Sequence, residues 1–345
     1  MPVPVHDRAV LIPLDLAPAV PPPGSRVHAC AGASMGTTWS ARVALDRVAL
    51  DAGQGDGLQA ALQAELDAVV AQMSHWDDDS LLSRYNGAPA GTWIDLPAQF
   101  FDVMNYALWA RDASGGALDP AAGSLVTLWG FGPVRRYDGA GFYAPDAAAV
   151  ARVQAQRADA PIALDRERRR LLQPGGATLD LSAVAKGYAV DRLAFRLAQR
   201  GLGHYLVEVG GELRGAGVKP DGQPWWVEIE GVPDGAGATP AAVALHGLAI
   251  ATSGDYRQYF QQGTQRVSHT LDPRTGWPIA NDVASVTVLA PSCMAADALS
   301  TALTVLGPVD GLAFAQRHGL AARFLVRRAG TLDEVQSPAW KALLQ

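Results

Sequence analysis

Helical and extended segments do not alternate regularly along this sequence, and their order limits the fold more than any other feature. Apolar residues recur with a helical period over 57–73 and 97–112, and further helices are predicted over 183–200 and 294–305. The predicted strands are 39–50, 204–209, 225–230, 247–252, 283–289 and 321–327. Four of these strands follow one another with no helix between them, whereas a doubly wound parallel sheet needs helical crossovers. The order therefore predicts an α+β fold with mostly antiparallel sheets and packed helices.

The composition is typical of a soluble globular protein. The 345 residues are 49% hydrophobic and 18% charged, which suits one large domain or two intimately associated lobes. The net charge of −6 argues against a general nucleic-acid surface, because such a surface needs a basic field. Cys30 and Cys293 are too few for a disulfide framework and too far apart for a CxxC motif, so two free thiols are predicted.

Residues 1–26 differ from the rest of the chain and are predicted to form a flexible, Pro-rich arm. Their apolar run is interrupted by two prolines and an aspartate, and three further prolines follow at 21–23. Neither a convincing secretion signal nor a lipoprotein processing site is visible, so the sequence alone favours a cytoplasmic location. Residues 27–345 are predicted to form the functional domain.

Asp297 and Thr301 form the first cluster that can carry chemistry. They are four residues apart in a predicted helix, so their side chains project from the same face. A carboxylate and a hydroxyl on one face suit a small hard cation such as Mg²⁺. A solvated aspartate and a threonine bonded to its own helix fit the spacing as well. The spacing alone favours this second interpretation, and the apolar neighbours of Asp297 weaken it, because they predict burial.

The second cluster, 178–188, runs from a strand end into the start of a helix, where free backbone N–H groups favour anions. Asp180 precedes the turn and Lys186 lies one turn inside the helix. Ser182 is the predicted N-cap of this helix, and Gly201 is predicted to take the left-handed conformation just beyond its end. Gly187 costs about 1 kcal/mol relative to alanine in a helix, which indicates close packing or close approach of a ligand. A capped helix with a surface lysine fits the same residues.

The third cluster, 268–276, places a histidine beside a tight turn. Asp-Pro followed by Thr-Gly is typical of a turn just after a strand. His269 is the candidate for proton transfer, because the pKa of imidazole lies near neutrality. A purely structural histidine fits the pattern too, and is the commoner case when such a residue is taken alone.

Smaller pieces offer glycine turns or rings that can approach a ligand. Met35 precedes a glycine turn, Trp76 offers a ring for stacking, and a flexible run at 114–120 leads to Asp119. Gly210-Gly211 ends a predicted strand. No GxGxxG or GxxxxGK[ST] fingerprint occurs, so no nicotinamide or P-loop site is predicted.

Taken together and in order, these pieces resemble the ApbE-type FAD:protein FMN transferase family, whose fold is related to the T-fold. The resemblance spans nearly everything from residue 33 to 325. It rests on MGTTW (35–39), MSHWDDDSLLSRYN (73–86), SGGALDPAAGSLVTLWGFGP (114–133), LDLSAVAKGYAVD (179–191), VEVGGELRGAG (207–217), SHTLDPRTGWP (268–278) and SVTVLAPSCMAADALSTALTVLG (285–307). Many members begin with an export or lipoprotein signal, and this chain departs from that pattern.

The resemblance implies roles for individual residues. Asp297 and Thr301 match the family's side-chain magnesium ligands, and Ala183 matches the position that supplies a backbone carbonyl to the same ion. His269 matches the histidine implicated in catalysis. The positions that match FAD contacts are Met35, Trp76, Ala117, Leu118, Asp119, Asp180, Lys186 and Leu271. Trp76 stands where many members have tyrosine, which preserves stacking.

The implied reaction is a magnesium-dependent transfer of FMN from FAD to a threonine hydroxyl of an acceptor protein, with release of AMP. The implied acceptor is a flavoprotein of a redox or electron-transfer system. Two alternatives stay open at this stage. One is a magnesium-dependent FAD pyrophosphatase, in which water replaces the threonine. The other is a protein that binds FAD without turnover.

Overall fold

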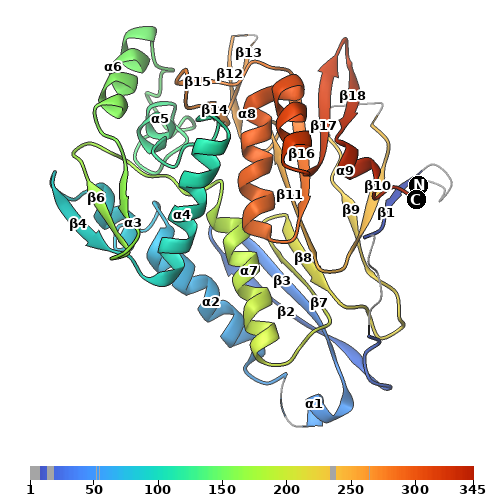
Figure 1. Cartoon of the computed structure of the whole chain (residues 1–345). Helices are drawn as coiled ribbons and strands as arrows, with labels where there is room; N and C mark the ends of the chain where they lie inside the picture. Colours follow the sequence, from blue (N-terminus) through green and yellow to red (C-terminus); the bar gives the residue numbers. More distant parts are fainter. Residues whose placement is uncertain (1–7, 14–18, 52, 54, 234–237, 264) are drawn as a thin grey trace.

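The computed structural model describes residues 8–13, 19–51, 53, 55–233, 238–263 and 265–345. Its centre is an eight-stranded sheet in the order β18-β17-β16-β11-β8-β7-β3-β2, in which every neighbouring pair is antiparallel (Figure 1). These strands are β2 Arg26–Ser34, β3 Thr37–Leu45, β7 Tyr205–Val209, β8 Glu212–Ala216, β11 Leu248–Gly254, β16 Val283–Ala290, β17 Ala321–Arg328 and β18 Thr331–Gln336. The predicted α+β fold with mostly antiparallel sheet is confirmed.

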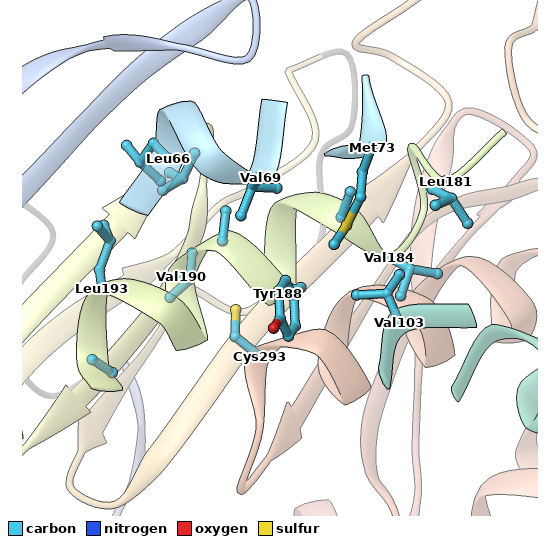
Figure 2. Packing of buried hydrophobic residues seen from close by; sticks show 14 of the residues in the cluster. Leu66, Val69, Met73, Val103, Leu181, Val184, Tyr188, Val190, Leu193 and Cys293 are labelled. Carbon is cyan, nitrogen blue, oxygen red and sulfur yellow. The ribbon is translucent and has the colours of Figure 1, made fainter. Parts of the chain in front are cut away.

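Four helices lie on one face of this sheet (Figure 1). They are α2 Leu58–Met73, α4 Ala98–Ala113, α7 Ala185–Gln199 and α8 Cys293–Arg317. Three of them contact the strands of this sheet, and the fourth, α4, packs against α8 and α2. Their apolar sides meet in one buried cluster. Figure 2 shows Val69 of α2, Val103 of α4 and Tyr188 of α7 pointing into it. Burying this apolar area is the main stabilising term for the fold.

The other face is covered by a three-stranded sheet in the order β1-β10-β9 and by α9. Their bounds are β1 Ala9–Leu11, β9 Trp225–Ile229, β10 Ala241–Leu245 and α9 Pro338–Lys341. Central strands are therefore apolar on both faces. In β16, for example, Val288 faces the helices and Leu289 faces the second sheet. Because both faces are covered, all eight residues of β16 are buried, including the polar Ser285 and Thr287.

Smaller elements form the remainder. Two of the sheets, β4-β6-β5 and β14-β15, lie beside the helices, and β12 pairs with β13. Their bounds are β4 Thr92–Asp95, β5 Ala163–Asp165, β6 Arg170–Gln173, β12 Tyr259–Gln262, β13 Gln265–Ser268, β14 Leu271–Asp272 and β15 Trp277–Pro278. The short helices are α1 Arg47–Asp51, α3 Leu81–Asn86, α5 Gly123–Leu128 and α6 Ala147–Ala158. None of these elements was predicted from periodicity. The strand predicted over 39–50 ends at Leu45, because apolar and polar residues stop alternating there.

Part of the predicted N-terminal arm is a strand. Ala9–Leu11 form β1, which pairs with β10 in parallel, and Leu11 is fully buried. The backbone N–H of Gln345 also donates to the carbonyl of Val10 at 3.0 Å. The expectation of a loose arm is therefore wrong for these three residues, because their apolar side chains complete the second core. Residues 1–7 and 14–18 of the predicted arm lie outside the described residues, and the domain boundary at residue 27 stays a prediction.

Helix α8 bends near its middle. Gly307 has a positive φ of 78° and Pro308 follows it, so the first segment ends where the predicted helix 294–305 ends. Asn281 donates from Nδ2 to the carbonyl of Thr304 at 2.8 Å and so binds a backbone group freed by the bend. Among the described residues, α8 alone is long and apolar enough to cross a membrane, and 61% of that apolar window is buried inside the fold.

Candidate active site

The ends of several elements surround one cavity of about 970 Å³. It lies where the start of α7, the first half of α8, the β2–β3 and β7–β8 turns and the segments after β11 and β13 come together. Every residue that the family resemblance singled out lines this cavity. They are Met35, Trp76, Ala117, Leu118, Asp119, Asp180, Ala183, Lys186, His269, Leu271, Asp297 and Thr301. These residues lie up to 266 positions apart in the sequence, from Met35 to Thr301, and the cavity brings them together.

The first structural feature of the cavity is the contact between α7 and α8 at Gly187. The N–H of Gly187 donates to Oδ2 of Asp297 at 2.8 Å instead of to the carbonyl four residues earlier, which belongs to Ala183. Within the described part of the chain, no hydrogen bond is made to the Ala183 carbonyl oxygen. Asp297 therefore accepts the N–H that would bind the Ala183 carbonyl in a regular helix, and the Ala183 carbonyl oxygen is left without a donor among the described residues.

Glycine is needed at position 187 because α7 and α8 approach closely there. This is the close packing that a glycine inside a helix indicated in the sequence. A Cβ added there would lie 2.3 Å from the Cys293 carbonyl oxygen and 2.7 Å from Cβ of Asp297. Gly187→Ala is therefore expected to lower the free energy of unfolding by about 1–3 kcal/mol or more. Urea unfolding measures the loss. The matched control is Gly203→Ala, where an added Cβ meets nothing within 4 Å and the change is expected to stay within about 0.5 kcal/mol. Equal stability of the two variants would contradict this account.

Asp297 and Thr301 have surroundings that suit a cation. Asp297 is only 4% exposed, which excludes the solvated aspartate considered above, and burial raises its pKa although Lys186 opposes the rise. The hydroxyl of Thr301 lies 3.0 Å from the hydroxyl of Ser253 rather than on its own helix. The backbone carbonyl of Asp297 accepts instead from Ser300 Oγ at 2.9 Å.

These observations test whether the cavity fits a magnesium ion. A carboxylate, a hydroxyl and a free carbonyl are all oxygen donors, and hard cations prefer oxygen. Among the described residues, no group of three or more His, Cys, Asp or Glu side chains is placed to hold a metal. A site here must therefore use mixed donors, and Asp297, Thr301 and the Ala183 carbonyl provide them. The residues present fit the ion.

Lys186 brings a positive charge into the cavity. Its Nζ donates to Oε1 of Glu212 at 2.6 Å, and its side chain is 31% exposed whereas that of Glu212 is 2% exposed. Burial works against the charged form of Lys186, but the carboxylates of Asp297 and Glu212 outweigh it, and the pKa of Lys186 is raised. Burial also raises the pKa of Glu212 to about 7, and the nearby Lys186 limits the rise. The ammonium group of Lys186 is therefore fixed by Glu212, and Lys186 is not the unpaired surface lysine of the alternative interpretation given above.

His269 follows β13 and lies at the same cavity. Its Nδ1 is 2.9 Å from the carbonyl of Gln258, and because a carbonyl only accepts, Nδ1 must carry a proton in that contact. Nε2 of the neutral ring is then free to accept a proton. Burial lowers the pKa of His269, opposed by the Gln258 carbonyl, so the neutral form dominates at pH 7. Phe131 lies edge-on to the ring with centroids 6.2 Å apart and helps to fix its orientation.

Asp119 and the turn after His269 are joined by a residue that sequence reasoning missed. Arg157 of α6 donates to Oδ2 of Asp119 at 2.5 Å, to the carbonyl of Pro273 at 2.8 Å and to that of Ala121 at 3.1 Å. Its side chain is 10% exposed. No local pattern marks this arginine, because its partners lie 36 to 116 positions away. Arg157 therefore fixes two walls of the cavity relative to each other.

The rim of the cavity contains Met35 and Trp76. Met35 and Gly36 form a two-residue hairpin turn with φ values of 53° and 71°, as a type I′ turn requires. Trp76 is 53% exposed, and the guanidinium of Arg136 lies 5.7 Å from its ring centroid. An exposed indole at the rim is available to stack on a planar group.

Asp180 and Ser182 form a turn before α7. The N–H of Ser182 donates to Oδ1 of Asp180 at 2.7 Å, and the helix begins at Ala185 with Val184 as its N-cap. The prediction that Ser182 caps this helix is wrong, because Ser182 lies two residues before the observed N-cap, Val184, and its N–H is bonded to Asp180. Gly201 does adopt the left-handed conformation after the last turn, with a φ of 72°.

Comparison with known proteins agrees with this geometry. The sequence model of the ApbE family matches residues 35–324, and the chain therefore belongs to the ApbE family. A protein of Klebsiella pneumoniae named FAD:protein FMN transferase is 36% identical over 325 residues, which cover 93% of this chain and 91% of that protein. One of the same name from Salmonella typhimurium is 36% identical over 338 residues and covers 97% and 94%.

Solved structures of the family share the fold. The flavinyl transferase ApbE of Pseudomonas stutzeri in its apo form superimposes with a TM-score of 0.81 at 36% identity, covering 96% of this chain and 98% of that one. The flavin transferase ApbE of Vibrio cholerae gives 0.82 at 34% identity, covering 93% and 100%. The predicted membership of this family is confirmed.

Proposed function

We propose that this protein is an FAD:protein FMN transferase that uses a magnesium ion to move FMN from FAD onto a threonine hydroxyl of an acceptor protein. The observation that carries the proposal is the meeting, in one cavity, of three oxygen donors that include the buried Asp297 carboxylate, the Lys186 ammonium group and a neutral histidine. The relatives named FAD:protein FMN transferase support the same reaction.

The cavity suits FAD in size and in chemistry. Its volume of about 970 Å³ lies at the upper end of the usual range for a small-molecule site. Leu118 and Leu271 provide apolar wall, and Trp76 provides an aromatic surface for a flat ring system. Lys186 provides a positive charge for the pyrophosphate. The cavity therefore supplies surfaces for both the rings and the charged centre of the substrate.

Asp297, Thr301 and the Ala183 carbonyl would hold the magnesium ion. When bound, the ion neutralises charge that develops on the pyrophosphate oxygens. Nε2 of His269 accepts the proton of the threonine hydroxyl as its oxygen attacks the FMN-side phosphorus. A new P–O bond to threonine forms, the bond from that phosphorus to the bridging oxygen breaks, and AMP leaves with the bridging oxygen. Lys186 offsets phosphate charge throughout.

The test is mass spectrometry of a candidate flavoprotein acceptor after incubation with the enzyme, FAD and MgCl₂. We expect the acceptor to gain the mass of an FMN phosphoester, with one AMP released per acceptor modified. Three controls accompany it: no enzyme, EDTA in place of MgCl₂, and an acceptor whose target threonine is valine. FMN and AMP formed at the same rate without acceptor would instead identify a pyrophosphatase. Intact FAD after prolonged incubation would identify a binding protein.

A further inference from the structure

Glu212 is a buried charged group in the cavity to which the proposed reaction gives no role. It is the first residue of β8, after the Gly210-Gly211 turn, and its side chain is 2% exposed. Oε1 accepts from Lys186 Nζ at 2.6 Å, whereas Oε2 is buried with no hydrogen-bond partner among the described residues. A buried carboxylate with one unpaired oxygen is costly, so its presence calls for an explanation.

Lys186 is the single hydrogen-bond partner of this carboxylate in the described part of the chain. Lys186 also lies next to Gly187, whose N–H is bonded to Asp297. The carboxylates of Asp297 and Glu212 both stabilise the charged form of the Lys186 ammonium group. A 2.6 Å contact exists with Glu212, and no hydrogen bond is made between Lys186 and Asp297.

The choice between the two carboxylates matters for metal binding. An ammonium group bonded to Asp297 would occupy an oxygen that a magnesium ion needs, and two cations close together repel each other. Glu212 is buried, and so it holds the lysine in a fixed place instead of letting it move along the cavity wall. Three covalent or hydrogen-bonded links, Glu212 to Lys186 to Gly187 to Asp297, connect the anchor to the predicted metal ligand.

We propose that Glu212 is a positioning residue, which holds the Lys186 ammonium group away from Asp297 and so keeps that carboxylate free for magnesium. The inference rests on the magnesium site of the proposed function. The proposed role of Glu212 depends on Lys186 and would be lost if Lys186 were removed. It also explains why a charged residue stands at the start of the central strand β8.

The test is titration of MgCl₂ into the full-length protein without FAD, followed by calorimetry. Four proteins are compared: native, Glu212→Gln, Lys186→Met and the double variant. Glutamine keeps the shape of residue 212 but lacks the charge that competes with Asp297 for the lysine. We expect Glu212→Gln to bind magnesium about tenfold more weakly, a coupling typical of neighbouring charged groups. Lys186→Met should bind at least as tightly as the native protein, and the double variant should lie within about twofold of Lys186→Met.

The rescue by Lys186→Met separates positioning from a simple charge effect. If Glu212→Gln weakens magnesium binding equally with and without Lys186, Glu212 contributes only negative charge and the proposal is overturned. It is also overturned if Glu212→Gln leaves the affinity unchanged. Should Glu212→Gln fail to fold, the double variant lacks both charges of the pair, and weaker magnesium binding by the double variant than by Lys186→Met overturns the proposal. Absence of magnesium binding by the native protein would overturn the metal site itself, a distinct result.

Discussion

Asp297→Asn is expected to lower the rate of FMN transfer by at least about a thousandfold, because it removes the anionic ligand of the magnesium site. The amide oxygen of asparagine can still accept the N–H of Gly187, now made at 2.8 Å, so the contact between α7 and α8 should survive. Burial raises the pKa of Asp297, which means that its charge is unfavourable when no cation is bound. The variant should therefore be at least as stable as the native protein in EDTA.

Three measurements check this expectation: acceptor flavinylation by mass spectrometry, magnesium binding by calorimetry, and thermal unfolding in EDTA. The matched control is Asp310→Asn, because Asp310 is exposed on the same helix and does not line the cavity. We expect that control to retain native activity. Full magnesium-dependent activity of Asp297→Asn would remove Asp297 from the metal site. Loss of activity together with a large loss of stability would show that its role is structural.

The core elements were predictable because their signals are local. The apolar period of α2 and the turn glycine after α7 are properties of a few neighbouring residues, and both predictions are confirmed. The region between Trp129 and Gln173 was not predictable in this way. Its short helix α6 is fixed to the remainder by side chains such as Arg157, whose partners are distant in sequence. Tertiary contacts rather than local periodicity determine its structure.

The site residues also differ in whether a local sequence signal marks them. The spacing of Asp297 and Thr301 indicated a shared helix face, and both side chains line the cavity. Ala183 had no such signal, because a backbone carbonyl leaves no trace in residue type. It is free only because Asp297 takes the N–H of Gly187, an interaction between residues 110 positions apart. Family resemblance supplied that position where spacing could not. The same limit hid Glu212, whose pairing with Lys186 spans 26 positions.

His269→Asn is expected to lower kcat for FMN transfer by about a hundredfold to ten-thousandfold, the usual contribution of a general base. The amide N–H of asparagine can replace Nδ1 as donor to the Gln258 carbonyl, a contact of 2.9 Å, while Nε2 is lost. The cavity wall should therefore keep its shape. We expect the dissociation constant of FAD, measured by flavin fluorescence, to change by less than about threefold, because the change removes a proton acceptor rather than a binding surface. Loss of FAD binding would contradict this role.

The pH dependence of kcat/KM identifies which group accepts the proton. Burial lowers the pKa of His269 below its ordinary value of 6.5, so Nε2 stays unprotonated until the pH falls below that value. The native rate should therefore be level around pH 7 and should decline only on the acid side, as pH falls through the lowered pKa. Glu212 is the rival group, because burial raises its pKa to about 7. If His269 is the base, the acid decline disappears in His269→Asn. A decline that persists with a midpoint near 7 would assign the titration to Glu212, since that carboxylate is unchanged in the variant.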